Sequence, residues 1–391
     1  MVFLGRTVFC FAVETKNGLV EEFYSNGALK ARRTYKNGIL YGKSKTFYPD
    51  GKIMGITQYK KDELDGLYIS YYENGNVYFE KAYKNGFQHG LSKEYYQTGQ
   101  LKSEEYFKVD NLEGISKYYF EDGKMQFLMN FKNGQLERTS KEFFKNGKLK
   151  NETNYIGGQW DGAIKEYDES GQLLTEWTYK EGIRQGPGKI FYPNGHIKWE
   201  AEFIDDKMQG WSIAYSESGH ILMEAYFNDN KLEGGAKEYY ETGSLKSVTH
   251  YKNDLKHGLS EEYFPNGQLS VEREYKDGQE VGIAKEYYEN GSIWVTRSYF
   301  NDKGDGILRE YYKSGELKQE WNISSGVYQG SSKGYYKSGV LMSEELYKNG
   351  KKDGIQHSYG ENGNVMYEDT FSEDKLIHRR AYDENGNFIE N

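Results

Sequence analysis

Residues Tyr71 to Tyr96 read YYENGNVYFEKAYKNGFQHGLSKEYY, and this pattern of aromatic pairs and turn residues recurs throughout the 391-residue chain. A glycine marks each copy, always 24 residues after the one before. The fifteen glycines are at positions 27, 51, 75, 99, 123, 147, 171, 195, 219, 243, 267, 291, 315, 339 and 363. A fixed period of this length is typical of repeat proteins, in which each copy packs against its neighbours.

The residues around each glycine predict a hairpin turn. The preceding residue is always Asn, Asp, Ser or Thr, and three of the four prolines, Pro49, Pro193 and Pro265, lie two residues before the glycine. Proline presets φ at the first central position of a type I turn, and glycine adopts positive φ without steric cost. The sequence therefore predicts a three-residue hairpin loop that ends in a G1 bulge.

This turn sets a strand register. It places an aromatic residue four before the glycine, such as Phe23, opposite an aliphatic residue or Met two after it, such as Leu29, in all fifteen copies. Such pairs stabilise an antiparallel sheet. On the other face the same register predicts opposite-charge pairs. These are Glu22 with Lys30, Glu94 with Lys102, Glu142 with Lys150, Glu238 with Lys246, and Glu310 with Lys318.

A second turn is predicted between successive hairpins. An aromatic residue eight after the glycine, such as Tyr83, precedes it in every copy except at Ile323. The residue eleven after the glycine is always Gly, Asp or Asn, which tolerate the left-handed region. Another glycine follows four residues later, with Arg138 and His378 as departures that we expect to alter the local curvature. We expect the aromatic residues four before and eight after the glycine to share one face.

The fold class follows from these two turns. The chain is predicted to be all-β, an elongated array of tandem 24-residue β-hairpins that forms a twisted or curled antiparallel meander. Residues 1–17 form a half repeat or capping strand in this interpretation, residues 18–377 the tandem hairpins, and residues 378–391 a shortened capping hairpin. Atypical end units are expected because they cap an otherwise open stack.

Composition agrees with a thin sheet. Apolar residues make up 36% of the chain, and 38 residues are Tyr, whose apolar ring and polar hydroxyl suit a half-exposed face. The net charge of −9 disfavours nucleic acid and anionic membranes as partners. The single cysteine, Cys10, indicates no compartment. We expect a cytoplasmic protein, or an exported one if the N-terminal segment, Met1–Val13, is a signal remnant instead of a first strand.

No pattern in the chain predicts catalysis, and we expect no enzyme, cofactor or metal site. The seven histidines fall at several different positions of the repeat, whereas a metal site needs converging ligands. His89 and His257 share one turn position with Asp, Glu and Gln, which indicates surface turn residues. Glu recurs five after the glycine, as at Glu80, Glu104 and Glu152, which indicates a solvated stripe paired with Lys. Nucleophile elbows, Walker loops and dinucleotide fingerprints are missing from the sequence.

One surface is a candidate binding site. A second aromatic residue recurs three before the glycine, and its tyrosines form a predicted stripe interrupted at Asp168, Ser216 and Gly360. Exposed tyrosine is enriched at interface centres, so the stripe is either a protein-binding surface or simply the cover of the second face of a single-layer sheet. The members of this tyrosine stripe are Tyr24, Tyr48, Tyr72, Tyr96, Tyr240, Tyr288, Tyr312 and Tyr336.

Three short segments carry a family resemblance: YKNGFQHG at Tyr83–Gly90, YKNDLKHG at Tyr251–Gly258 and YKNGKKDG at Tyr347–Gly354. They resemble the core of the MORN repeat, and the joined form with YYENG or FYPNG is similar to the MORN-variant repeat of bacterial YwqK-type antitoxin components. The resemblance covers essentially the whole chain and supplies no catalytic residue. It implies a β-hairpin scaffold that binds a protein partner, in some members a toxin.

Two alternatives to a toxin-neutralising scaffold stay open. MORN repeats in some lipid-linked proteins imply a membrane-associating module, which the acidic balance disfavours. A structural or cell-surface rod is the other alternative. The identity of the partner and the oligomeric state are not predicted by the sequence.

Overall fold

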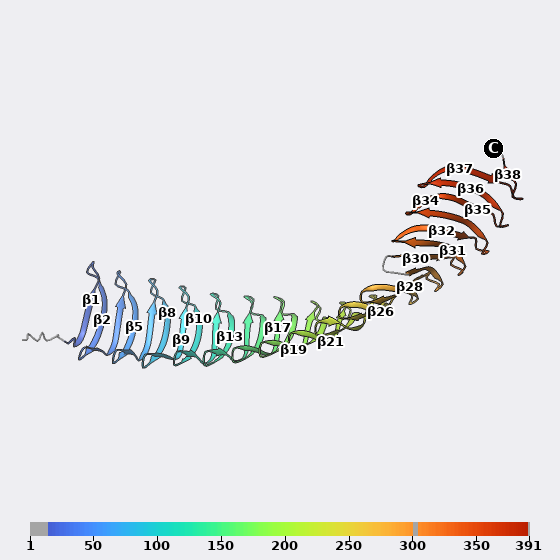
Figure 1. Cartoon of the computed structure of the whole chain (residues 1–391). Coiled ribbons are helices and arrows are strands. Elements are labelled where there is room, and N and C mark those ends of the chain that lie inside the picture. The colour runs from blue at the N-terminus through green and yellow to red at the C-terminus, as the bar shows by residue number, and fades with distance from the viewer. Residues whose placement is uncertain (1–14, 300–303, 390–391) are drawn as a thin grey trace, which may run out of the picture. The chain divides into compact units, whose positions relative to one another are not determined.

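The computed structural model describes residues 15–299 and 304–389, and every strand pairing in this part is antiparallel. The predicted strand near Phe9 and the segment Met1–Val13 lie outside the described residues. The chain divides into two compact units, Met1–Gly195 and His196–Asn391. Both units consist of the predicted hairpins, and the described part contains strands and turns without helix (Figure 1).

The first unit contains strands β1 to β19. Their bounds are β1 Gly18–Phe23, β2 Leu29–Lys36, β3 Ile39–Leu40, β4 Gly42–Phe47, β5 Ile53–Lys60, β6 Glu63–Leu64, β7 Gly66–Tyr71, β8 Val77–Lys84, β9 Phe87–Tyr95, β10 Leu101–Lys108, β11 Asn111–Leu112, β12 Gly114–Tyr119, β13 Met125–Lys132, β14 Gln135–Leu136, β15 Arg138–Phe143, β16 Leu149–Ile156, β17 Gln159–Tyr167, β18 Leu173–Lys180 and β19 Ile183–Phe191.

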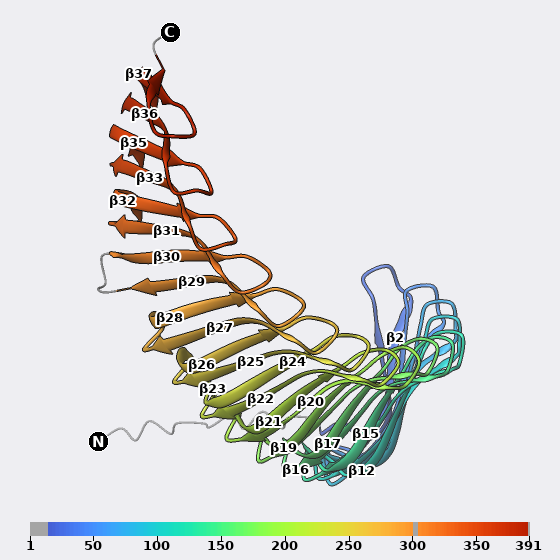
Figure 2. The ribbon, with the colours of Figure 1, turned by 90° about the vertical axis from the view of Figure 1, so that its right-hand side faces the viewer.

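The second unit contains strands β20 to β38, which follow one another side by side in chain order (Figure 2). Their bounds are β20 Ile197–Ile204, β21 Lys207–Tyr215, β22 Ile221–Asn228, β23 Lys231–Leu232, β24 Gly234–Tyr239, β25 Leu245–Lys252, β26 Leu255–Tyr263, β27 Leu269–Lys276, β28 Gln279–Tyr287, β29 Ile293–Tyr299, β30 Gly306–Tyr311, β31 Leu317–Ser324, β32 Val327–Tyr335, β33 Leu341–Lys348, β34 Lys351–Lys352, β35 Gly354–Tyr359, β36 Val365–Ser372, β37 Lys375–Tyr382 and β38 Phe388–Ile389.

The hairpin between β7 and β8 has the predicted turn. The N–H of Gly75 donates to the carbonyl of Tyr72 over 2.9 Å, and Gly75 has a φ of 93°, as the glycine of a G1 bulge requires. Beyond the turn, Tyr71 lies opposite Val77, so the predicted aromatic–aliphatic pair is confirmed.

The second turn is tighter than the pattern alone indicated. Lys84 pairs with Phe87, which leaves a two-residue loop of Asn85 and Gly86. Both loop residues have positive φ, 49° and 82°, as in a type I′ turn. Asp62 has a φ of 66° at the position of Gly86 one repeat earlier, so the prediction of a left-handed residue eleven after the glycine is confirmed.

A bulge shortly after each turn glycine corrects the predicted faces. Tyr71 pairs with Val77 but Ser70 pairs with Phe79, so one extra residue, Tyr78, lies in the second strand. An extra residue reverses which side chains point to which face. Tyr83 therefore lies opposite Gly66 and on the face away from Tyr71, and the prediction that these two aromatic positions share a face is wrong.

The same bulge corrects the predicted charge pairs. Glu94 lies opposite Ser103, not opposite Lys102, because Lys102 is the bulged residue. The Lys102 side chain nevertheless reaches Glu94, with Nζ 2.7 Å from Oε1. Four of the five predicted pairs form such ion pairs, and the exception is Glu22, which pairs with Arg33. The other three are Lys150 with Glu142, Lys246 with Glu238 and Lys318 with Glu310.

Each hairpin thus has two distinct faces. We call the face of Ser70, Tyr72 and Tyr83 the serine face, and the face of Leu67 and Tyr71 the leucine face. The fully buried side chains of the described residues are mainly small and lie on the serine face. They include Ala31, Ser44, Ser92, Ser116, Ala225 and Ser332. Large side chains on both faces are only half-buried, as expected of a single-layer sheet.

The two departures from the turn glycine have different consequences. Arg138 keeps the left-handed backbone of the glycine it replaces, with a φ of 63°. At His378 the strand loses a residue instead: Phe371 pairs with Leu376 and Asp369 with Arg379. In an ordinary repeat, such as β8 paired with β9, the stretch of β9 that corresponds to this part of β37 contains one residue more. This loss explains why the last hairpin is out of phase by one residue.

Candidate interaction surfaces

The tyrosine stripe lies on the serine face, close to the hairpin turns. All eight hydroxyls donate to a backbone carbonyl 23 residues later in the chain, at 2.6–3.0 Å. The acceptor is always the aromatic residue four before the next turn glycine. The acceptors are Phe47, Tyr71, Tyr95 and Tyr119 in the first unit, and Tyr263, Tyr311, Tyr335 and Tyr359 in the second.

These hydrogen bonds make the stripe a connection between repeats. Each tyrosine is half-buried, and its hydroxyl is already used by the neighbouring repeat. The ring also contacts the bulge: Lys102 Nζ lies 6.0 Å from the centre of the Tyr96 ring. The predicted set leaves out Tyr192, which occupies the same position of its repeat. A role of the stripe in partner binding stays a prediction.

A second connection between repeats involves the residue ten before the turn glycine. In most repeats its side chain accepts a hydrogen bond from a backbone N–H 20 residues later, but Tyr41 and Val281 occupy this position in two of them. Glu113 Oε2 accepts from the N–H of Asn133 at 2.9 Å, and Glu233 Oε2 accepts from that of Asn253 at 2.9 Å. His257 is in this position too, and its Nδ1 lies 3.4 Å from the backbone nitrogen of Asp277. The turn position shared by His, Asp, Glu and Gln is therefore an acceptor position.

The leucine face carries a ladder of paired charges. Glu104 lies between two lysines, 3.5 Å from Lys93 Nζ and 3.8 Å from Lys117 Nζ. The next repeats continue the ladder, with Lys141 Nζ 3.0 Å from Glu152. The predicted pairing of the recurring Glu with Lys is confirmed at these positions. Half-exposed pairs of this kind contribute little stability each.

Beside the charge ladder lie exposed large apolar side chains, which occur in eight of the repeats at the position eight residues before the turn glycine. In the first unit they are between 49% and 62% exposed, although they are large and aliphatic. We call this set the aliphatic stripe. Its members are Leu19, Leu67, Leu91 and Ile115 in the first unit, and Trp211, Leu259, Ile283 and Ile355 in the second. The sequence signal is an apolar residue directly after the second glycine of the repeat, which the periodicity of the aromatic residues does not reveal.

Thirteen segments of the chain match the family model of the MORN repeat variant. They are residues 16–37, 40–61, 64–85, 88–108, 112–133, 139–156, 160–181, 184–205, 232–253, 256–277, 280–301, 304–323 and 328–349. Together they make up more than half of the sequence. The chain belongs to the MORN repeat variant family.

Other comparisons add little to this assignment. No curated protein matches the chain. Two crystal structures, of TcdB2-TccC3 and of TcdB2-TccC3-Cdc42, align with 93% of the chain at 11% identity and a TM-score of 0.16. The structure of a Photorhabdus luminescens Tc holotoxin pore aligns with 95% of it at 10% identity and the same TM-score. The chain spans about a quarter of the length of each, at 26%, 27% and 26%.

The fold continues through a segment that the family model does not match. Residues 206–231 contain β21 and β22, which pair as in the other MORN repeats: Tyr215 lies opposite Ile221, and Ala214 opposite Met223. Trp211 of the aliphatic stripe contacts Tyr226 across this pair, with ring centres 5.6 Å apart. The hairpin geometry is therefore retained where the sequence departs from the family pattern.

The described MORN repeats contain no group of three or more His, Cys, Asp or Glu side chains arranged to hold a metal ion. Cys10 lies outside the described residues. Within residues 15–299 and 304–389 no helix has the length and hydropathy that a membrane crossing requires.

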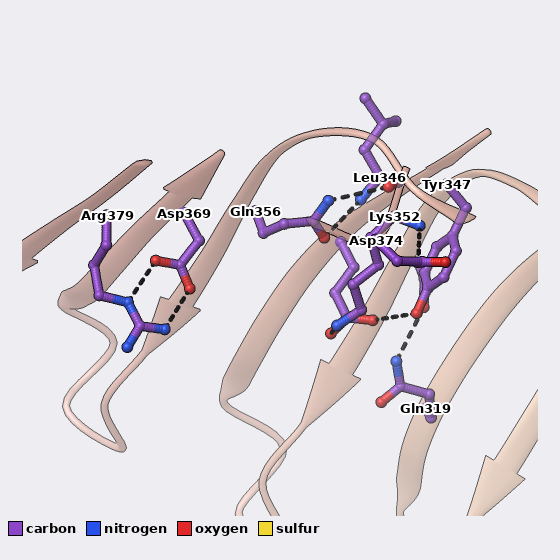
Figure 3. A network of polar contacts seen from close by, with 10 residues as sticks. Gln319, Leu346, Tyr347, Lys352, Gln356, Asp369, Asp374 and Arg379 are labelled. Atoms are coloured by element: carbon purple, nitrogen blue, oxygen red, sulfur yellow. Dashed lines mark hydrogen bonds and ion pairs between the residues drawn. The ribbon is translucent and has the colours of Figure 1, made fainter. Parts of the chain in front are cut away.

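The end of the second unit has its own polar network (Figure 3). Arg379 binds the buried carboxylate of Asp369 through two bonds of 2.7 Å, from Nε and from Nη2. One repeat earlier, Gln356 is bonded to both the N–H and the carbonyl of Leu346, each at 3.0 Å. These contacts connect β37 to β36, where the hairpins lose their regular phase, and β35 to β33 one repeat earlier.

Proposed function

We propose that the chain is a non-catalytic scaffold that binds a protein partner along its leucine face, and that the partner is a toxin or other effector which it neutralises. The MORN repeat variant fold supports the scaffold, since this family is generally non-catalytic. The observation that carries the choice of surface is the aliphatic stripe. Its side chains lie at the same position of eight repeats, including the consecutive Leu67, Leu91 and Ile115, and they are exposed instead of packed against the next repeat.

The chemistry of the leucine face favours a protein over other partners. Aliphatic side chains at intervals of two strands, about 10 Å, match the spacing of anchors along an extended protein surface. The neighbouring ladder has both signs of charge, as a polar interface rim does. The net charge of −9 disfavours nucleic acid and anionic membranes as partners.

The test compares two sets of variants of the full chain. In the first, Leu67, Leu91 and Ile115 are replaced by Ser. In the matched control, Lys43 and Thr139, which occupy the same position in other repeats, are replaced by Ser. A partner is first identified by co-purification from the native cell, and its affinity is then measured with purified proteins.

We expect the triple variant to bind the partner at least tenfold more weakly, with unchanged circular dichroism, and the control to bind normally. Neutralisation predicts further that the partner inhibits growth when it is expressed alone and that co-expression of the wild-type chain restores growth. Equal affinity of the triple variant and the wild type would overturn the choice of surface. Sedimentation of the chain with anionic liposomes at low salt would favour the membrane-associating alternative.

A further inference from the structure

The last complete repeat lacks the aromatic side chain that most others have near the hairpin turn. The residue three before the turn glycine is Tyr or Phe in most repeats, but it is Gly360 before Gly363. In the repeat before, the hydroxyl of Tyr336 donates to the carbonyl of Tyr359 at 2.7 Å. The equivalent acceptor for position 360 is the carbonyl of Tyr382. Glycine has neither a ring nor a hydroxyl to offer it.

A hollow of about 520 Å³ lies at this place in the second unit. Its volume falls within the range of about 300–1,000 Å³ that is typical of small-ligand sites. The lining comes from the two turns between which the missing ring would lie. It includes Gly360, Asn364, Met366, Tyr367, Ala381 and Tyr382.

Two side chains of the lining are suited to contact an aromatic ring. Met366 is 39% exposed and Tyr367 is 37% exposed, so both have surface left uncovered. In other repeats the residue at the position of Met366 contacts the ring three before the glycine: Tyr78 lies 4.8 Å from Tyr72, between ring centres. A methionine thioether also makes favourable contacts with aromatic rings.

The network at the end of the unit keeps this lining in place. The Arg379 guanidinium lies over the Tyr367 ring, 4.8 Å from its centre. The two hydrogen bonds from Arg379 to the buried Asp369 hold the guanidinium there (Figure 3). Tyr367 is therefore supported on one side by a fixed cation, and we expect its position to persist whether or not the hollow is filled.

The other interruptions of the tyrosine stripe are of a different kind. At Asp168 the carboxylate turns back onto its own hairpin loop, where Oδ1 accepts hydrogen bonds from the N–H groups of Ser170 and Gln172. At Ser216 the hydroxyl accepts from the N–H of His220 at 3.1 Å. Both residues place a polar group at the turn, whereas Gly360 leaves apolar surface uncovered.

We propose that this hollow binds a tyrosine side chain of the protein partner. The ring packs against Met366 and Tyr367, and the hydroxyl donates to the carbonyl of Tyr382, as the chain's own tyrosines do in the preceding repeats. The inference rests on the proposed function for the source of the tyrosine, whereas the site itself follows from the repeat. Position 360 corresponds to Tyr72 on the serine face, so a partner bound along the leucine face would reach the hollow around the hairpin turns.

The site is tested without any partner by NMR of the full chain labelled at its methionine methyl groups. The probe is p-cresol, the side-chain analogue of tyrosine, and toluene is the analogue without the hydroxyl. The Met366 signal is assigned with Met366→Leu. We expect a saturable shift of that signal with p-cresol and at least threefold weaker binding of toluene, since toluene cannot donate to the Tyr382 carbonyl.

A filled variant provides the second measurement. The three atoms nearest to a Cβ at position 360 belong to side chains: Asn362 Oδ1 at 2.9 Å, and Sδ and Cγ of Met366 at 3.3 and 3.7 Å. Gly360→Tyr is therefore expected to fold and to abolish the response to p-cresol. Ser216→Tyr, the same substitution in another interrupted repeat, is expected to leave the response unchanged. An unresponsive Met366 signal in the wild type, or an unchanged response in Gly360→Tyr, would overturn the site.

Partner binding separates the two proposals. If the hollow holds a partner tyrosine, Gly360→Tyr lowers the affinity for the partner at least tenfold while the aliphatic stripe is intact. Normal partner affinity in Gly360→Tyr, together with p-cresol binding in the wild type, would refute the partner's tyrosine as the ligand and leave the proposed function standing. The partner's tyrosine would likewise be refuted as the ligand if the aliphatic-stripe variants lost partner binding and Gly360→Tyr did not.

Discussion

The tyrosine stripe and the aliphatic stripe occur in the same hairpins, five residues apart, yet they differ in what they offer to a partner. Tyr96 donates its hydroxyl to the carbonyl of Tyr119 at 2.8 Å and is half-buried. Leu91, on the leucine face, is 49% exposed. From the residue types alone, Tyr96 would be expected to be the exposed residue and Leu91 the one packed against the next repeat. The difference arises because the next repeat supplies an acceptor on one face and no cover on the other.

The largest effect is expected on removing a ring of the tyrosine stripe. Tyr96→Ser loses the buried part of the ring and the hydrogen bond to the next repeat, which together cost about 2–3 kcal/mol in the free energy of unfolding. Urea denaturation followed by circular dichroism measures the loss. The matched variant on the other face, Leu91→Ser, is expected to change the free energy by less than about 0.5 kcal/mol. Equal losses in the two variants would contradict the assignment of the faces.

A smaller change separates the ring from the hydroxyl. Tyr96→Phe keeps the ring and removes the donor to the Tyr119 carbonyl, with an expected cost of about 1 kcal/mol. The chain itself shows that Phe is accepted at this position, as at Phe120 and Phe144. The measurement is the same urea titration, with Tyr106→Phe on the leucine face as control. A loss as large as that of Tyr96→Ser would mean that the hydroxyl alone connects the repeats.

Local chemistry explains which parts of this fold the sequence could predict. The turn glycines, the left-handed residue eleven after them and the pairing of Tyr71 with Val77 each depend on a few neighbouring residues, and all are confirmed. The bulge at Tyr78 leaves no mark in the residue types, so the faces beyond it were predicted wrongly. A regular 24-residue period is compatible with the side chains after the bulge pointing to either face of the sheet.

The candidate surfaces were harder to predict for a related reason. The hydrogen bond from Tyr72 to the Tyr95 carbonyl joins residues 23 apart, and it depends on how one hairpin lies on the next. Sequence periodicity shows that the tyrosines recur, but it does not show how far apart the repeats lie. The hollow at Gly360 is likewise visible in the sequence only as an interruption, because its lining comes from a terminal hairpin with one residue fewer.

The smallest expected effect is on the pH dependence of stability. It concerns tyrosines on the leucine face and appears only at high pH. The Tyr215 hydroxyl donates to Glu200 Oε1 at 2.7 Å. Burial, and then this hydrogen bond to a charged acceptor, raise the pKa of Tyr215 to about 12. The unfolded chain loses that proton near pH 10, so this tyrosine's contribution to stability is complete below pH 10 and is lost as the pH rises toward 12.

Replacing the carboxylate tests this cause. In Glu200→Gln the acceptor is neutral, so the pKa of Tyr215 should fall but stay above 10, because burial persists. NMR of chain labelled at the tyrosine Cζ, with Tyr215→Phe for assignment, follows the titration. Tyr239, whose pKa is raised by burial and by Glu224, is the internal control and should titrate unchanged. An unchanged Tyr215 titration would show that burial alone raises the pKa of Tyr215. The tyrosines of the leucine face would then be less exposed to a partner than the aliphatic stripe beside them.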